Sequence, residues 1–284
     1  MRSYLTEILI TVASLTVMSL VMVAYFKAVK EEKAYSSPDA LYTIVPPNAR
    51  TLLAINRPYL FNEMILSHQA LRPVFVAAIP DIFFSLLNTE RQTYPVLFSF
   101  HPQGVVCYVQ GGSRTAAWIT NELLPERFRY YPPQKQTADG IDFYYYPDTE
   151  NRYFGYYVHN GIWVGSYSSK LLERAAVQQL QGEILLPEAM NNLRETFDTQ
   201  APLNLICPAG ELGIDAVRWL PADLFVSEGS ICCHTHLPYA AAGNAAAFGD
   251  TLSRRIEDKY PSLRIRFQID HEEETVYYTG CIPN

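Results

Sequence analysis

The chain has 284 residues, of which 49% are apolar and 18% are charged, and its formal net charge is −7. This composition supplies material for a sizeable core and excludes an intrinsically disordered chain. The acidic balance excludes a nucleic-acid surface, which needs a basic stripe, so we expect no nucleic-acid partner.

The first segment, Ile8–Phe26, contains no charged residue. Its length approaches the roughly 20 apolar residues that a helix needs to cross a bilayer core. A backbone in lipid must satisfy its own hydrogen bonds, so residues 1–26 are expected to hold a transmembrane helix. The run exceeds a typical signal-peptide core, and the residues at its end, Tyr25 to Lys27, are too bulky for a good cleavage site. We therefore favour a retained anchor over a cleaved signal.

The charges that flank this segment leave its orientation open. Arg2 precedes the segment, whereas Lys27, Lys30 and Lys33 follow it. The positive-inside rule then places the following chain in the cytoplasm. A single N-terminal anchor also commonly exports everything behind it, and we favour this arrangement. The expectation is a single-pass protein of the bacterial inner membrane, with Ile8–Phe26 in the membrane and a periplasmic domain.

Residues 27–47 read as a linker, and an α+β domain with a mainly antiparallel sheet follows it. TLLAI predicts a strand, and the apolar stretch 71–87 predicts helices broken at Pro80. Two β-rich runs on either side of HPQG predict a hairpin, and Ser113 is expected to cap the next helix.

Asn-Gly and Asp-Gly pairs predict tight turns between the aromatic strands that come next, at Asp139-Gly140 and Asn160-Gly161. Ser168 or Ser169 is expected to cap the helix that follows these strands. Strand-like runs return after residue 186, and a helix and a closing hairpin end the chain. We divide the domain into a first α+β half, residues 48–186, and a shorter second half, residues 187–284. The two halves are interpreted as related, and one continuous sheet is an alternative for how they join.

A resemblance to a family rests on three stretches, VPPNARTLLAINRP, GIWVGSYSSKLLERAAVQQL and APLNLICPAG. They resemble an uncharacterised family of bacterial membrane-anchored envelope proteins that carry a domain of unknown function. The resemblance covers most of the chain behind the linker. It implies an envelope location and supplies no catalytic residues.

The aromatic runs are the main candidates for a binding surface. Tyrosine is enriched at interfaces because its ring offers a large contact area at a low entropic cost. These runs predict a face that binds a protein, lipid or glycan, and ordinary sheet packing is the alternative. The candidate residues are Tyr144, Tyr145, Tyr146, Tyr153, Tyr156 and Tyr157.

A metal site is the second candidate. Cys232, His234 and His236 share one face if their segment is a strand, and thiol and imidazole groups are zinc ligands. A strand with buried thiols and exposed histidines is the alternative. The five cysteines are odd in number and form no repeated framework, which excludes a small disulfide scaffold and leaves any pairing open.

The remaining motifs favour structural roles. His101 in FHPQG lacks a nucleophile or orienting acid next to it in sequence, so a turn histidine is expected. Asp270–Glu274 reads as the charged tip of the last hairpin. No cofactor motif is present, and none is expected. The sequence therefore favours a non-enzymatic, membrane-anchored binding protein, with a metal-dependent hydrolase or an accessory subunit of a membrane complex as alternatives.

Overall fold

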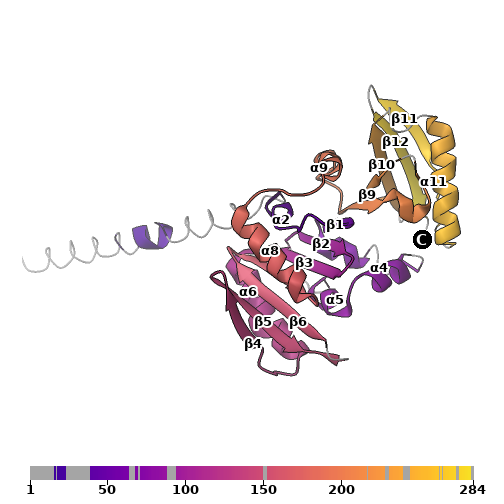
Figure 1. The fold of residues 1–284 in the computed structure, drawn as a ribbon. Coiled ribbons are helices and arrows are strands. Elements are labelled where there is room, and N and C mark those ends of the chain that lie inside the picture. The colour runs from indigo at the N-terminus through magenta and orange to yellow at the C-terminus, as the bar shows by residue number, and fades with distance from the viewer. Residues whose placement is uncertain are drawn as a thin grey trace, which may run out of the picture.

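The computed structural model describes most of the chain behind residue 38 and a short piece before it. The described residues are 16, 18–23, 39–63, 68–69, 71–87, 94–149, 152–215, 217–227, 230–238, 244–261, 263, 265–272 and 275–282. They form one twelve-stranded sheet with helices packed on both of its faces (Figure 1).

The strands follow the order β11-β12-β10-β9-β8-β1-β2-β3-β7-β6-β5-β4, and every neighbouring pair is antiparallel. Their bounds are β1 Thr51–Ile55, β2 Val96–His101, β3 Gly104–Gln110, β4 Gln134–Ala138, β5 Ile141–Pro147, β6 Tyr153–His159, β7 Ile162–Ser166, β8 Leu203–Pro208, β9 Trp219–Ser227, β10 Ser230–Pro238, β11 Gln268–Glu272 and β12 Thr275–Ile282. The mainly antiparallel sheet agrees with the sequence pattern. Because β8 pairs with β1, residues on both sides of 186 share one sheet, and the relatedness of the two halves stays a prediction.

The helices and helical turns connect these strands. Their bounds are α2 Asp39–Tyr42, α3 Pro58–Phe61, α4 Arg72–Ala78, α5 Asp81–Leu87, α6 Gly112–Trp118, η2 Ile119–Leu123, α7 Leu124–Arg127, α8 Ser169–Gln181, α9 Glu188–Glu195, η4 Ala209–Leu212 and α11 Ala245–Lys259. α4 and α5 are separated at Pro80, as the sequence predicts. Figure 1 shows α8 across the middle of the sheet and α11 along β11 and β12 at one end.

The expected N-terminal transmembrane helix is not supported. Of Ile8–Phe26, the structure describes Thr16 and residues 18–23, which are helical with exposed side chains; the rest lies outside the described residues. Crossing a bilayer core takes about 20 apolar residues, and the longest helix among the described residues, α11, has 15. No described helix is long and apolar enough to cross a membrane. The single-pass inner-membrane location that rested on this helix is corrected with it.

The core lies on both sides of the sheet, because successive strand residues point to opposite faces. Leu53 packs in the layer covered by α3, α5, α6 and α7, whereas its neighbour Leu52 packs in the layer covered by α2, α8 and α9. A third cluster lies beneath α11, around Phe248 and Tyr278. Strands covered on both faces read as nearly continuous apolar runs, and β1, TLLAI, does after its first residue.

Local sequence signals place several turns and caps correctly. Both predicted turns have positive φ at their two central residues, 50° and 77° at Asp139 and Gly140, and 49° and 73° at Asn160 and Gly161. This backbone is the one that a two-residue type I′ hairpin requires.

Of the two predicted helix caps, one is confirmed and one is wrong. Ser168 caps α8 through its hydroxyl, which accepts from the Leu171 amide at 3.4 Å. Ser113 does not cap its helix, since α6 begins one residue earlier, with Gly111 at the N-cap and no side-chain bond.

Candidate functional site

The six candidate tyrosines lie on β5 and β6, and most of them belong to the core. Tyr145, Tyr146, Tyr156 and Tyr157 are buried, Tyr144 is half-buried and Tyr153 is exposed. The reason is that both faces of these strands are covered. On one face Phe128 stacks on Tyr146 with 4.4 Å between ring centroids, and on the other Tyr157 packs in the layer beneath α8. These placements leave Tyr153 and part of Tyr144 accessible to a partner.

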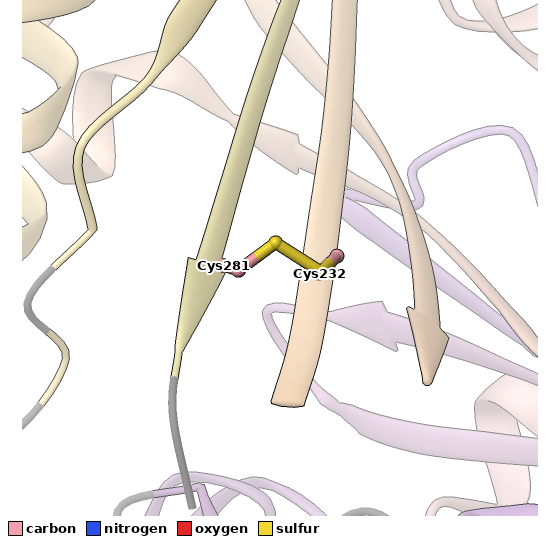
Figure 2. Close-up of a disulfide and its surroundings, with 2 residues drawn as sticks. All are labelled: Cys232 and Cys281. Atoms are coloured by element: carbon pink, nitrogen blue, oxygen red, sulfur yellow. A yellow bond between two sulfur atoms is a disulfide. The ribbon is translucent and has the colours of Figure 1, made fainter. Parts of the chain in front are cut away.

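The candidate metal ligands lie on β10 in the expected alternation, but one of them is already bonded. Cys232 forms a disulfide with Cys281 of β12, and Figure 2 shows the bond joining the two neighbouring strands. The sulfur is therefore not free to bind zinc. His234 lies 4.9 Å from the Phe225 ring, and His236 is buried. The described residues contain no group of three His, Cys, Asp or Glu side chains placed to hold a metal ion.

His101 belongs to a chain of hydrogen bonds that its local sequence does not reveal. Its Nε2 lies 2.8 Å from Ser99 Oγ and its Nδ1 lies 3.0 Å from Asn48 Oδ1. Ser99 Oγ also lies 2.9 Å from Tyr108 Oη. The order serine, histidine, asparagine has the connectivity of a nucleophile, its base and an orienting group. Ser99 and Tyr108 are both 0% exposed, so substrate has no access and the chain is structural. Burial lowers the pKa of His101 to about 4.

A second polar cluster crosses the sheet close to α9, and we call it the polar row. It consists of His236 on β10, Asp223 on β9, Asn204 on β8 and Asn56 directly after β1. Asn204 and Asp223 are direct cross-strand partners. Asn204, Asp223 and His236 are each buried to 5% exposure or less. Buried polar groups of this kind require hydrogen-bond partners.

Asn56, Asn204 and Asp223 find partners in one another, whereas His236 is bonded to Thr196 outside the row. Asn204 Nδ2 donates to Asp223 Oδ1 at 2.6 Å, and Asn56 Nδ2 donates to Asn204 Oδ1 at 2.5 Å. Three neighbouring strands are thus joined by side-chain bonds as well as by their backbones. Burial raises the pKa of Asp223 from its ordinary value of 3.8 to about 6, against the opposing effect of the bonds from Asn204 and from the Asp198 backbone.

The same side chains hold the segment that follows α9, residues 196–202, which we call the α9 loop. The Asp198 amide donates to Asp223 Oδ2 at 3.1 Å, and its carbonyl accepts from Asn204 Nδ2 at 3.2 Å. The Ala201 carbonyl accepts from Asn56 Nδ2 at 2.8 Å. Thr196 at the start of the loop is hydrogen-bonded to His236 Nε2. Polar side chains therefore fasten the loop to the sheet, in addition to the backbone bonds from Asn56 and Arg57 to the Pro202 carbonyl.

A pocket of about 520 Å³ lies beside this loop, between α2, α9 and the ends of β1 and β8. We call it the α9 pocket. Its lining residues are Asp39, Tyr42, Asn56, Arg57, Pro95, Arg194, Glu195, Phe197, Thr199 and Asn204. Its volume is in the range of about 300–1,000 Å³ that is usual for small-molecule sites. The lining side chains offer hydrogen-bonding groups and charges of both signs.

Arg194 of α9 organises one wall of the pocket. Its guanidinium is hydrogen-bonded to Asp39 of α2, and its Nε donates to Asn191 Oδ1 at 3.0 Å. The same group lies 5.0 Å from the centroid of the Tyr42 ring, within cation–π distance. Tyr42 is buried, and this burial raises its pKa. α2 and α9, which are far apart in sequence, are thereby joined at the pocket.

Sequence reasoning missed the polar row and the pocket. The available indication was a single polar residue at an inward-facing position of an apolar strand, as in LNLI for Asn204 and ADLF for Asp223. Period-two counting puts such a residue in the core, where it needs a partner. The partner itself lies on another strand or in a loop, so the pattern indicates that a network exists and does not identify its members.

No family model and no curated protein sequence matches this chain. The resemblance to an envelope family therefore stays a prediction. Among solved structures, crystal form I of TP0453 is similar at 14% sequence identity and a TM-score of 0.51, over 87% of this chain and 94% of that chain. Crystal form III has 12% identity and a TM-score of 0.48, over 85% and 93% of the two chains. At this identity, the likeness to crystal form I speaks to the fold alone.

Proposed function

We propose that this protein is a binding protein whose α9 pocket holds a small polar ligand. The observation that carries the proposal is the polar row, which fixes the α9 loop and thereby the Phe197 and Thr199 side of the pocket. A wall held by buried hydrogen bonds is preorganised, and preorganisation lowers the entropic cost of binding.

The proposal keeps binding as the function and changes its location. The sequence favours an aromatic sheet face for a protein, lipid or glycan, but four of the six tyrosines are in the core. The disulfide at Cys232 removes support for a hydrolase that uses this sulfur as a metal ligand. The role of an accessory subunit in a larger complex stays a prediction.

The experiment is to fill the pocket and measure ligand-dependent stabilisation. A panel of small polar compounds is screened by the shift in thermal unfolding of the full chain. A ligand at 100 times its Kd stabilises a one-site protein by about 2.7 kcal/mol. Thr199→Trp places a large ring at the pocket wall, and Thr149→Trp makes the same change at an exposed threonine in the β5–β6 connection.

We expect compounds from the panel to stabilise the wild-type chain and the Thr149→Trp variant and to lose their effect on Thr199→Trp. A panel that stabilises none of the three proteins contradicts the proposal. So does a compound that stabilises Thr199→Trp as strongly as the wild type, since its site then lies elsewhere.

A further inference from the structure

We infer that the α9 pocket is built for a small zwitterion, a molecule that carries both an ammonium and a carboxylate group, such as a free amino acid or a dipeptide. The inference rests on the ligand-binding function proposed above and adds the chemical class of the ligand. It follows from which charges of the lining are already paired and which remain open.

Arg194 is the paired cation. Its side chain is 10% exposed, and its guanidinium bonds to Asp39, to Asn191 and, at 3.5 Å, to Glu195 Oε1. The ring of Tyr42 covers it further. Three of its five N–H donors are used in this way, and its charge is paired with two carboxylates, so we assign Arg194 to positioning the pocket wall.

Arg57 is the open cation. Its Nη2 donates to the neutral Gln200 Oε1 at 3.0 Å, and among the described residues no carboxylate forms an ion pair with it. A guanidinium has five N–H donors in a fixed fork that matches a carboxylate. Arg57 lines the pocket two residues after β1 and supplies its unpaired positive charge.

The part of the lining on α2 and α9 carries an excess of negative charge. Asp39 of α2 and Glu195 of α9 both pair with the single guanidinium of Arg194. Two carboxylates and one cation leave one net negative charge at this wall. The side chains of Asp39 and Glu195 are 66% and 60% exposed, so their remaining lone pairs are accessible.

Asn56 adds an acceptor next to Arg57. Its amide nitrogen donates to the Ala201 carbonyl and to Asn204 Oδ1. A backbone carbonyl can only accept, so this contact fixes which end of the amide is the nitrogen. Both N–H groups are then used within the protein, and Oδ1 is the atom left for a ligand. An N–H donor of the ligand, such as its ammonium group, fits this acceptor.

These features together match a zwitterion better than a simple ion or a neutral sugar. A ligand carboxylate pairs with Arg57, and the ligand ammonium is attracted by the excess negative charge of Asp39 and Glu195. A polyanion is repelled by that wall, and a neutral sugar leaves Arg57 without a counter-charge. The volume of about 520 Å³ holds a free amino acid or a dipeptide.

The test is isothermal titration calorimetry of the full chain with defined probes. The probes are the twenty amino acids one at a time, glycylglycine, glucose and inorganic phosphate. For the tightest amino acid, the N-acetyl derivative removes the ammonium and the amide derivative removes the carboxylate. We expect an amino acid or glycylglycine to bind, and each derivative to bind at least tenfold more weakly. Comparing the affinity of the tightest amino acid with that of glycylglycine distinguishes a free amino acid from a dipeptide as the ligand.

Variants test the two ends of the pocket separately. Arg57→Gln is expected to weaken amino-acid binding at least tenfold, whereas Arg50→Gln, an exposed arginine just before β1, is expected to leave it within twofold. Glu195→Gln changes an exposed side chain with little risk to folding and is expected to weaken amino-acid binding while leaving the weak binding of the N-acetyl derivative unchanged.

The outcomes separate this inference from the proposed function. If glucose or phosphate binds in a Thr199-dependent manner and no amino acid or dipeptide does, the ligand class is wrong and the binding function stands. If no probe and no panel compound binds, the binding function itself fails. Equal amino-acid affinity in the wild type, Arg57→Gln and Glu195→Gln overturns the assignment of the two charged ends.

Discussion

Replacing Asp223 by asparagine is expected to change how the stability of the protein depends on pH. Burial raises the pKa of this carboxyl group from 3.8 to about 6 in the folded chain. Between these values the folded protein keeps a proton that the unfolded chain releases. Because the unfolded state then binds fewer protons, the free energy of unfolding falls as pH rises through this window.

The magnitude follows from the size of the shift. One pKa unit corresponds to about 1.4 kcal/mol, so raising the pKa of Asp223 from 3.8 to about 6 corresponds to about 3 kcal/mol. The free energy of unfolding of the wild type is therefore lower by about 3 kcal/mol above pH 6 than below pH 3.8. Asparagine does not titrate, so Asp223→Asn removes the pH-dependent part. It also loses an acceptor for the Asp198 amide or for Asn204, a cost that does not vary with pH.

The assay is urea unfolding of the wild type and Asp223→Asn at half-unit steps from pH 3.5 to pH 7.5. The difference in unfolding free energy, variant minus wild type, is expected to rise by about 3 kcal/mol across the series. Other titrating groups are common to both proteins and cancel. Asp250→Asn on α11 supplies the baseline for removing an exposed carboxylate. A difference that stays flat from pH 3.5 to pH 7.5 refutes the reasoning.

Two further predictions concern the other buried groups. Burial lowers the pKa of His101 from 6.5 to about 4, so on acidification the unfolded chain binds a proton before the folded chain does. The free energy of unfolding of the wild type should therefore fall by about 3 kcal/mol between pH 6.5 and pH 4, and His101→Gln should abolish this fall. The same urea series measures it, and an equal pH dependence in the two proteins contradicts the prediction. The Cys232–Cys281 disulfide closes a separation of 49 residues, so Cys281→Ser should cost about 4 kcal/mol in chain entropy. Urea unfolding measures this cost, and reductant should lower the stability of the wild type but not of the variant; equal effects on both would exclude the bond as the cause.

Local features were predictable because short-range physics decides them. The turns at Asp139-Gly140 and Asn160-Gly161 need residues that tolerate positive φ, and few pairs do so as readily. Ser168 caps α8 because its hydroxyl reaches a free amide within the same turn. The break between α4 and α5 follows from the backbone that Pro80 permits.

Predictions that depended on which side chains are accessible were mostly wrong. The tyrosine runs look the same in sequence whether a face is open or covered, and the packing of Phe128 and α8 over β5 and β6 places most of those rings in the core. Cys232 and Cys281 became a disulfide because β10 and β12 are neighbours, a fact that a separation of 49 residues does not reveal. The expected transmembrane helix finds no support among the described helices.

The sequence by itself determined the two tight turns, the cap of α8 and the break at Pro80, since each depends on residues only a few positions apart. The tertiary structure alone decided the polar row and the α9 pocket. Asn56, Asn204 and Asp223 come from three different parts of the chain, and their side chains bond because β1, β8 and β9 are neighbours in the sheet. His236 on the next strand, β10, bonds to Thr196 of the α9 loop. Strand order is set by the packing of the whole domain, so no local sequence pattern predicts that these side chains lie together.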